Sequence, residues 1–139
     1  MKLISLTTLL FLFVLLYSTP TLIAQEMTPE QVVQKSMEAY NNRDINAFMA
    51  VMDANVSVHN FSDGAVTMQG ATACEEVYSD LFKASPNLNS KILTRTVFGN
   101  KIIDHEYITG RNGSDQAIEL LLIYEVENEK IVKITVLRK

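Results

Sequence analysis

The chain of 139 residues is short of several residue types, and each shortage excludes a class of protein. Its single cysteine, Cys74, excludes an intramolecular disulfide framework and any cysteine-rich zinc module. Basic residues are outnumbered, with 12 Lys and Arg against 16 Asp and Glu, and a formal charge of -4 argues against nucleic-acid binding by phosphate neutralisation. A hydrophobic fraction of 47% is too high for intrinsic disorder. The length fits one folded domain.

Motifs for several chemistries are also missing from the sequence. It has no glycine-rich phosphate loop and no Gly-x-Ser-x-Gly elbow. The two histidines, His59 and His105, lie far apart and show neither His-x-His nor His-Glu-x-x-His spacing, so a third converging ligand would be needed for a metal. We therefore predict neither a metal nor any other cofactor.

The longest hydrophobic run lies near the N-terminus and is too short for a membrane span. Twelve of the fifteen residues from 3 to 17 are apolar, and Pro20 interrupts the run before the roughly 20 residues that a spanning helix needs. This pattern is typical of a signal peptide, predicted here over 1–24 with cleavage after Ala24. The domain 25–139 is then expected to be soluble, free of the membrane and secreted or periplasmic. An uncleaved N-terminal anchor is the alternative.

Two helices are predicted in the first part of the domain. Thr28 and Gln31 form a capping box around a proline at the first helical position, and the apolar stripe that follows runs to Asn42. Asp44 caps a second, short helix, whose apolar residues recur at helical spacing as far as Met52. Both helices are therefore amphipathic, with one face for a core.

A third helix and a first strand are predicted in the middle of the chain. Alternation over 56–59 indicates a short strand, and 63–70 reads as a loop. Thr72 and Glu75 form a second capping box, and the third helix ends before Pro86. Cys74 lies on the apolar stripe of this helix and is interpreted as a buried hydrophobe.

The C-terminal half is predicted to form four strands in an antiparallel meander from Leu88 onward. Turn signals at 99–100, 110–113 and 127–129 separate the strands. The third of them, 117–126, is apolar on both faces, so helices are expected to cover one face. The other face would be covered by the sheet's own curvature or by a second subunit; the second is favoured and predicts a homodimer through the sheet.

The whole domain resembles the SnoaL-like branch of the nuclear transport factor 2-like superfamily, which includes ketosteroid isomerase. The residues that carry the resemblance are 32–45 for paired helices, 53–59 for a strand, Gln69-Gly70 before the third helix, and 103–110, 123–126 and 130–132 in later strands. The resemblance implies an α+β roll of the cystatin-like kind: a cone-shaped, curved, mostly antiparallel sheet on three helices of the N-terminal half. It also implies an apolar pocket at the wide end of the cone.

The catalytic residues of ketosteroid isomerase are not present at the matching positions. The resemblance places the carboxylate base at Asn60, the oxyanion tyrosine at Ser36 and the protonated acid at Leu122. Asparagine cannot abstract a proton, serine is shorter than a phenol, and leucine donates no hydrogen bond. That isomerase mechanism is therefore not expected.

Two acidic residues and a histidine remain as candidates for acid or base chemistry. Asp104 and Glu106 alternate on one strand, so both side chains point to one face and His105 to the other. The family resemblance favours the pocket face, where two close carboxyls would raise each other's pKa and could share a proton. Alternatively, they are rim carboxylates paired with a nearby cation. The candidate partners are Lys101, Arg95 and Arg111.

His59 ends the first predicted strand, and its near-neutral pKa suits a general base, although a hydrogen-bonded structural histidine is the alternative. The tyrosines are interpreted as core aromatics whose hydroxyls tip into the pocket. The candidate catalytic residues are Asp104, Glu106 and His59. The candidate ligand-binding residues are Tyr40, His59, Asn60, Tyr78, Asp104, Glu106, Leu122 and Tyr124.

Two kinds of function follow from this reading. The first is a binding protein that holds a small hydrophobic ligand in the pocket, without established catalysis. The second is a small isomerase- or hydratase-like enzyme that uses Asp104, Glu106 or His59 as acid or base. A module that interacts with other proteins through the exposed sheet face is a further alternative.

Overall fold

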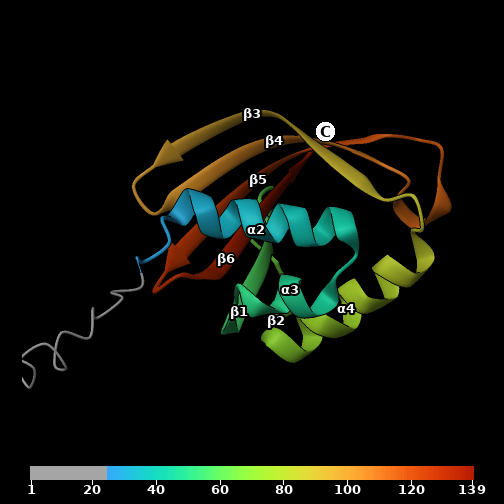
Figure 1. Cartoon of the computed structure of the whole chain (residues 1–139). Helices are drawn as coiled ribbons and strands as arrows, with labels where there is room; N and C mark the ends of the chain where they lie inside the picture. Colours follow the sequence, from blue (N-terminus) through green and yellow to red (C-terminus); the bar gives the residue numbers. More distant parts are fainter. Residues whose placement is uncertain (1–24) are drawn as a thin grey trace, which may run out of the picture.

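The computed structural model describes residues 25–139, so the expected signal peptide and its cleavage after Ala24 lie outside the described residues. Within this part, helices occupy the first half and strands dominate the second (Figure 1). The elements are α2 (Pro29–Asn42), α3 (Ile45–Ala50), β1 (Met52–Asn60), β2 (Val66–Gln69), α4 (Ala71–Ala84), β3 (Asn89–Phe98), β4 (Lys101–Thr109), the 3-10 helix η2 (Arg111–Gly113), β5 (Ile118–Glu127) and β6 (Lys130–Arg138).

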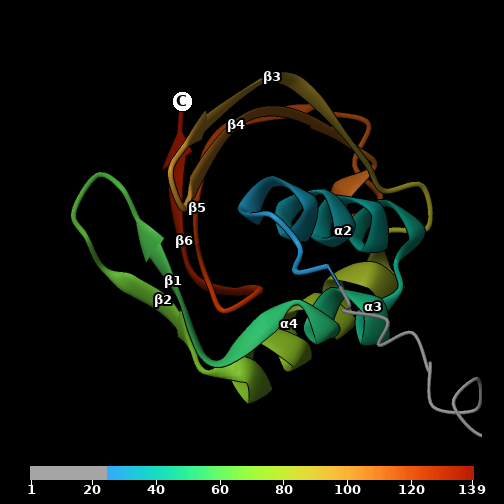
Figure 2. The ribbon, with the colours of Figure 1, turned by 60° about the vertical axis from the view of Figure 1, so that its left-hand side comes forward.

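The strands form one six-stranded sheet with the order β2-β1-β6-β5-β4-β3. Neighbouring strands are antiparallel except β1 and β6, which are parallel. The strands bend over α2, while α3 and α4 lie beneath it (Figure 2). The sheet remains open, with β2 and β3 at its edges. The predicted α+β class, with a curved and mostly antiparallel sheet on three helices, is confirmed.

The capping signals of the first two helices are confirmed, and that of the third is wrong. The Thr28 hydroxyl accepts a hydrogen bond from the backbone N–H of Gln31, and the Gln31 side chain accepts one from the backbone N–H of Thr28. Asp44 caps α3. The last helix begins at Ala71 after Gly70, without a side-chain cap, so Thr72 does not form the predicted capping box. Gly70 has a φ of +83°, a backbone conformation that favours glycine.

Several helix and strand assignments differ from the sequence prediction. Helix α3 ends at Ala50, and Met52 begins β1 instead of completing the apolar stripe of the helix. The predicted loop 63–70 contains a strand, β2, which pairs with β1 around Val58 and Met68. The meander of β3 to β6 is confirmed, with β5 one residue later than the predicted 117–126.

The inner face of the sheet packs on the helices and carries both polar and apolar residues. On β4, Ile102, Asp104, Glu106 and Ile108 are buried, and the residues between them are more exposed. Asp104 lies opposite Leu122 of β5, which places both on the same face of the sheet. Alternation along β4 therefore sends the two acidic side chains inward, as predicted, and His105 outward.

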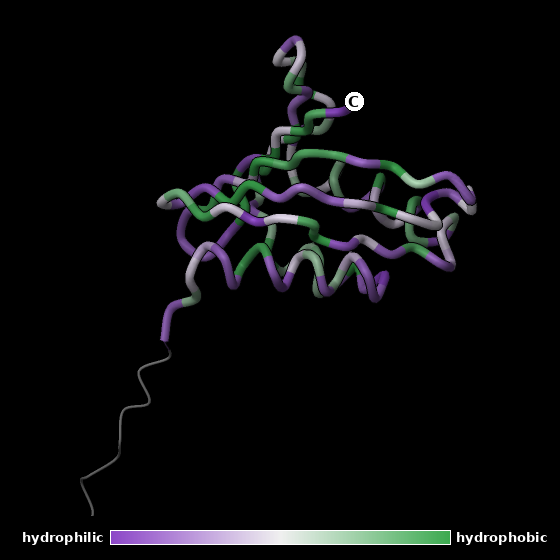
Figure 3. Tube along the Cα trace, turned by 90° about the horizontal axis from the view of Figure 1, so that it is seen from above, coloured by the Kyte–Doolittle hydropathy of each residue, from purple (hydrophilic) through white to green (hydrophobic). Residues whose placement is uncertain are grey.

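Hydrophobic residues recur along the strands and along α2 (Figure 3). The core joins the inner face of the sheet to the helices, with Val32, Phe48, Ile102 and Ile131 among its buried members. Between residues 25 and 139, no helix has the length and apolar character needed to cross a membrane.

Candidate functional site

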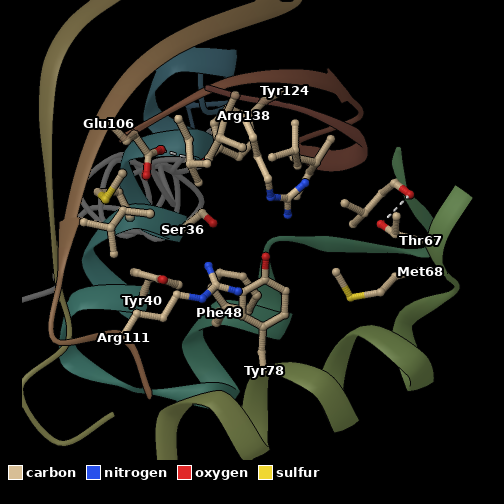
Figure 4. A pocket seen from close by; sticks show the side chains of 17 residues that line it. Ser36, Tyr40, Phe48, Thr67, Met68, Tyr78, Glu106, Arg111, Tyr124 and Arg138 are labelled. Atoms are coloured by element: carbon tan, nitrogen blue, oxygen red, sulfur yellow. Dashed lines mark hydrogen bonds between the residues drawn. The ribbon is translucent and has the colours of Figure 1, made fainter. Parts of the chain in front are cut away.

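A cavity of about 80 Å³ lies between the inner face of the sheet and the helices. All three α-helices, η2 and every strand of the sheet except β3 contribute to its wall (Figure 4). The lining residues are Ser36, Met37, Tyr40, Phe48, Val58, Thr67, Met68, Tyr78, Glu106, Ile108, Arg111, Leu120, Leu122, Tyr124, Ile134, Val136 and Arg138. The wall is mostly apolar with a few polar groups, which is the usual composition of a small-molecule site.

One side of the cavity is built from packed aromatic rings of the three helices. Tyr40, Phe48 and Tyr78 line the cavity, and Phe82 packs behind them. The ring centroids of Phe48 and Tyr78 are 4.4 Å apart, and those of Tyr40 and Phe82 are 5.7 Å apart. Tilted and edge-on contacts of this kind hold aromatic side chains in fixed orientations. The rings therefore form a rigid wall instead of filling the cavity.

Among residues 25–139, Glu106 brings the one carboxyl group into the cavity wall. Its side chain is only 2% exposed and accepts hydrogen bonds from the Ser90 hydroxyl at 2.8 Å and the Tyr124 hydroxyl at 3.0 Å. Burial raises the pKa of Glu106 above its ordinary value, although both hydrogen bonds act in the opposite direction. A buried carboxyl with a raised pKa can hold a proton nearer to neutral pH than an exposed one can.

Asp104 lies behind the cavity wall in a buried ion pair. It is fully buried, and its two oxygens accept hydrogen bonds from Nε and one terminal nitrogen of Arg95, both at 2.7 Å. The other terminal nitrogen of Arg95 donates to the Gln34 side chain at 3.0 Å. Asp104 is thus paired with one of its predicted partners, but in the interior instead of at a rim. Within residues 25–139, Asp104 bonds to Arg95 and Glu106 to Ser90 and Tyr124, and no hydrogen bond joins the two carboxyls.

The three tyrosines point into the interior, and their hydroxyls differ in their partners. Tyr124 donates to Glu106. The Tyr40 hydroxyl is buried, and no hydrogen bond of normal geometry reaches it from residues 25–139. Burial raises the pKa of Tyr40 to about 12 and raises that of Tyr78 further, while the nearby Arg111 lowers both pKa values. An unpartnered buried hydroxyl costs about 1–3 kcal/mol, which an acceptor in the cavity would offset.

His59 and Asn60 do not line the cavity, contrary to the sequence interpretation. Val58 takes the inward position on β1, so alternation turns His59 away, and its Nε2 lies 2.9 Å from the Ser57 hydroxyl oxygen. The Asn60 amide donates to the Ser62 and Asp63 side chains of the adjacent turn. Of the other candidates, Tyr40, Tyr78, Glu106, Leu122 and Tyr124 line the cavity, and Asp104 lies behind it.

Two arginines that the sequence interpretation did not place in the pocket lie in its wall. Arg111 of η2 and Arg138 at the end of β6 both extend their guanidinium groups toward the space in front of the Tyr78 hydroxyl (Figure 4). Neither forms a salt bridge with any residue in the described range 25–139. A signal for Arg111 exists in the sequence, because Gly110 and Gly113 on either side of it indicate a tightly held turn.

Cys74 is buried among apolar side chains, as predicted, and does not line the cavity. Burial raises the pKa of its thiol to about 11, so the thiolate is disfavoured at neutral pH. No group of three His, Cys, Asp or Glu side chains suited to a metal ion occurs between residues 25 and 139. Within the described residues, the polar groups of the site are therefore one carboxyl, three phenols, two guanidinium groups and the hydroxyls of Ser36 and Thr67.

The fold and its inner cavity define a protein of the nuclear transport factor 2-like class. The SnoaL-like domain family matches residues 33–134, and the chain belongs to this family. A search of curated proteins finds none that matches the chain.

Solved structures share the fold at low sequence identity. An uncharacterised cystatin-fold protein from Novosphingobium aromaticivorans is 19% identical and has a TM-score of 0.74 over 81% of this chain and 100% of its own. An NTF2-like protein of unknown function from Cytophaga hutchinsonii is 14% identical, with a TM-score of 0.70 over 84% and 95%. A protein with a ketosteroid isomerase-like fold from Catenulispora acidiphila, in complex with trimethylamine, is 17% identical, with a TM-score of 0.65 over 81% and 88%.

Proposed function

We propose that this chain is an exported protein that binds a small, mainly apolar ligand in the cavity. The observation that carries the proposal is the cavity itself, because a well-packed domain of this size rarely keeps such a space without a ligand or water. Its apolar wall would cover the body of the ligand. Its few polar groups, which include Glu106 and the Tyr40 hydroxyl, would fix the orientation.

Native mass spectrometry of the full-length gene product, purified from its own host, tests this proposal. We expect a chain that begins at Gln25 and carries the additional mass of a retained small molecule. Export would be contradicted by a membrane-bound chain that still begins at Met1. Ligand binding would be contradicted by a ligand-free protein that takes up no compound from a library of small apolar molecules.

A matched pair of variants links the retained ligand to the cavity. Leu122→Phe places a larger side chain in the cavity wall, and we expect it to abolish retention of the ligand while the protein still folds. Ile123→Phe makes the same kind of change at the next residue, which points to the opposite face of β5. Retention in the Leu122 variant, or an equal loss in both variants, would place the ligand elsewhere.

A second candidate function is an isomerase- or hydratase-like reaction, and Glu106 is the residue that favours it. Its raised pKa and its place in the cavity wall suit a general acid or base. His59 lies outside the cavity, and both oxygens of Asp104 are bound by Arg95. A Glu106-dependent turnover of the retained ligand would therefore favour an enzyme, and its absence would favour a binding protein.

We also propose that two copies of the chain associate through the outer face of the sheet. Leu121 and Leu137 are cross-strand neighbours there, beside Ile123. Tyr107, which is 42% exposed, extends the apolar surface on β4. These residues point away from the helices, and a second copy would cover them.

The dimer is tested by placing a charge on this face. Leu121→Lys is expected to shift the protein from dimer to monomer at micromolar concentration, because the ammonium group would be buried without a partner. Val77→Lys, at a 47% exposed position of α4 on the other side of the molecule from this face, is the control and should remain dimeric. Light scattering gives both masses. A monomeric unmodified protein would contradict the proposal and leave the face open to a different protein partner.

A further inference from the structure

We infer that the ligand of this cavity is a small organic anion, an aromatic carboxylate, whose negative group lies between Arg111 and Arg138. The inference rests on the proposed function, because it specifies the ligand of the same cavity. It is carried by the two guanidinium groups and by the tyrosine hydroxyls around the space that they face (Figure 4).

The charges of the cavity wall oppose the charge of the whole chain. The chain has a formal charge of -4, whereas the cavity wall contains two arginines and one carboxyl group, Glu106. The acidic residues of the described range form their salt bridges with other cations and leave Arg111 and Arg138 unpaired. A cavity of net positive charge, in an acidic protein, favours an anion over a neutral or cationic ligand.

The tyrosine hydroxyls supply further donors at the same place. The Tyr40 side chain is 8% exposed, and its hydroxyl lines the cavity without a hydrogen-bond partner in the described part of the chain. The Tyr78 hydroxyl points into the space between the two guanidinium groups (Figure 4). A hydroxyl donates one hydrogen bond, and a carboxylate can accept about four. An anion would therefore satisfy groups that the protein itself leaves open.

Arg111 is held in position by the turn that contains it. The backbone N–H of Asn112 donates to the hydroxyl of the buried Ser85 at 2.7 Å, which ties η2 to the end of α4. Gly110 has a φ of +69°, and a Cβ atom there would lie 2.2 Å from the carbonyl oxygen of Asn87. The turn therefore requires glycine and packs closely on the preceding loop. The backbone at Arg111 is therefore fixed before a ligand binds, which reduces the entropy that is lost on binding.

The shape of the wall favours a carboxylate on a flat apolar body. A guanidinium group matches the geometry of a carboxylate and binds it with two parallel hydrogen bonds. Arg138 is exposed, so it lies where the cavity meets solvent, whereas Phe48 and Met68 line the apolar part. An aromatic ring would lie against these apolar side chains, and the carboxylate would face the arginines.

Isothermal titration with benzoate and its neutral analogue benzamide tests the inference on the mature protein. We expect benzoate to bind at least tenfold more tightly than benzamide at pH 7. Arg111→Gln and Arg138→Gln should each weaken benzoate binding at least tenfold and leave benzamide binding unchanged. Lys91→Gln is the matched control: it removes one positive charge from an exposed position of β3 and should leave both affinities unchanged.

The failure of this inference can be distinguished from the failure of the proposed function. Equal affinities for benzoate and benzamide, both lost in Leu122→Phe, would contradict the inference that the ligand is an anion. The cavity would still be a binding site. An equal weakening by Lys91→Gln would show a general charge effect and would also overturn the inference. If neither compound binds and the protein from its host carries no ligand, both the inference and the proposed function fail. A thermal melt of each variant establishes that it is folded.

Discussion

Replacing Arg95 with methionine is expected to lower the free energy of unfolding by about 3–5 kcal/mol, because it leaves the carboxylate of Asp104 buried without a partner. The side chain of Asp104 is fully buried and that of Arg95 is 13% exposed, so solvent cannot replace the lost guanidinium. The two charge-assisted hydrogen bonds at 2.7 Å would be lost together. Urea denaturation at pH 7 measures the difference.

Two controls separate the buried charge from the loss of packing. The double variant Arg95→Met with Asp104→Leu removes both charges and should recover most of the lost stability, because apolar residues of similar size can replace a buried ion pair. Lys101→Met breaks the pair with Glu125, in which the side chains are 41% and 25% exposed, and should cost less than about 1 kcal/mol. A loss from Arg95→Met no larger than that from Lys101→Met would contradict this account of Asp104.

Most of the fold can be predicted from the sequence because capping and periodicity signals involve residues that are close together in the chain. The capping box at Thr28 and the alternation along β4 depend on backbone geometry alone, and both are found. The short edge strand β2 is missed because it has four residues, and only one of them is even partly buried. These four residues form a strand because they pair with β1. Four residues are too few to show the alternation of apolar and polar residues that indicates a strand.

The candidate site is only partly predictable from the sequence, because the cavity gathers residues that are far apart in the chain. The inward direction of Glu106 follows from its position on a strand, and the family resemblance supplies the pocket. His59 does not line the cavity because Val58, the preceding residue on the same strand, takes the inward position. Arg111 and Arg138 are 27 residues apart in the printed sequence, and only the packing of η2 and of the end of β6 brings their long side chains to one cavity.

Replacing Glu106 with glutamine is expected to stabilise the protein near neutral pH and to change its stability little near pH 4. Burial raises the pKa of Glu106 in the folded state above the unfolded value of about 4.5. Below that value, both states hold the proton and the carboxyl costs nothing. As the pH rises from the unfolded pKa toward the folded pKa, only the unfolded state ionises, so stability falls. Glutamine is neutral throughout and avoids this loss.

Urea denaturation of Glu106→Gln and of the unmodified protein, at several pH values between 4 and 8, measures this effect. The other titrating groups contribute equally to both proteins and cancel in the difference between their free energies of unfolding. Glu119→Gln is the control of opposite sign: hydrogen bonds from Lys139 and His105 lower the pKa of Glu119, so its variant should be less stable than the unmodified protein above about pH 4.5, and this deficit should shrink as the pH falls below that value. A difference between Glu106→Gln and the unmodified protein that stays constant from pH 4 to pH 8 would mean that Glu106 titrates normally. The cavity would then lack a proton-holding acid, and the binding protein would be favoured over the enzyme.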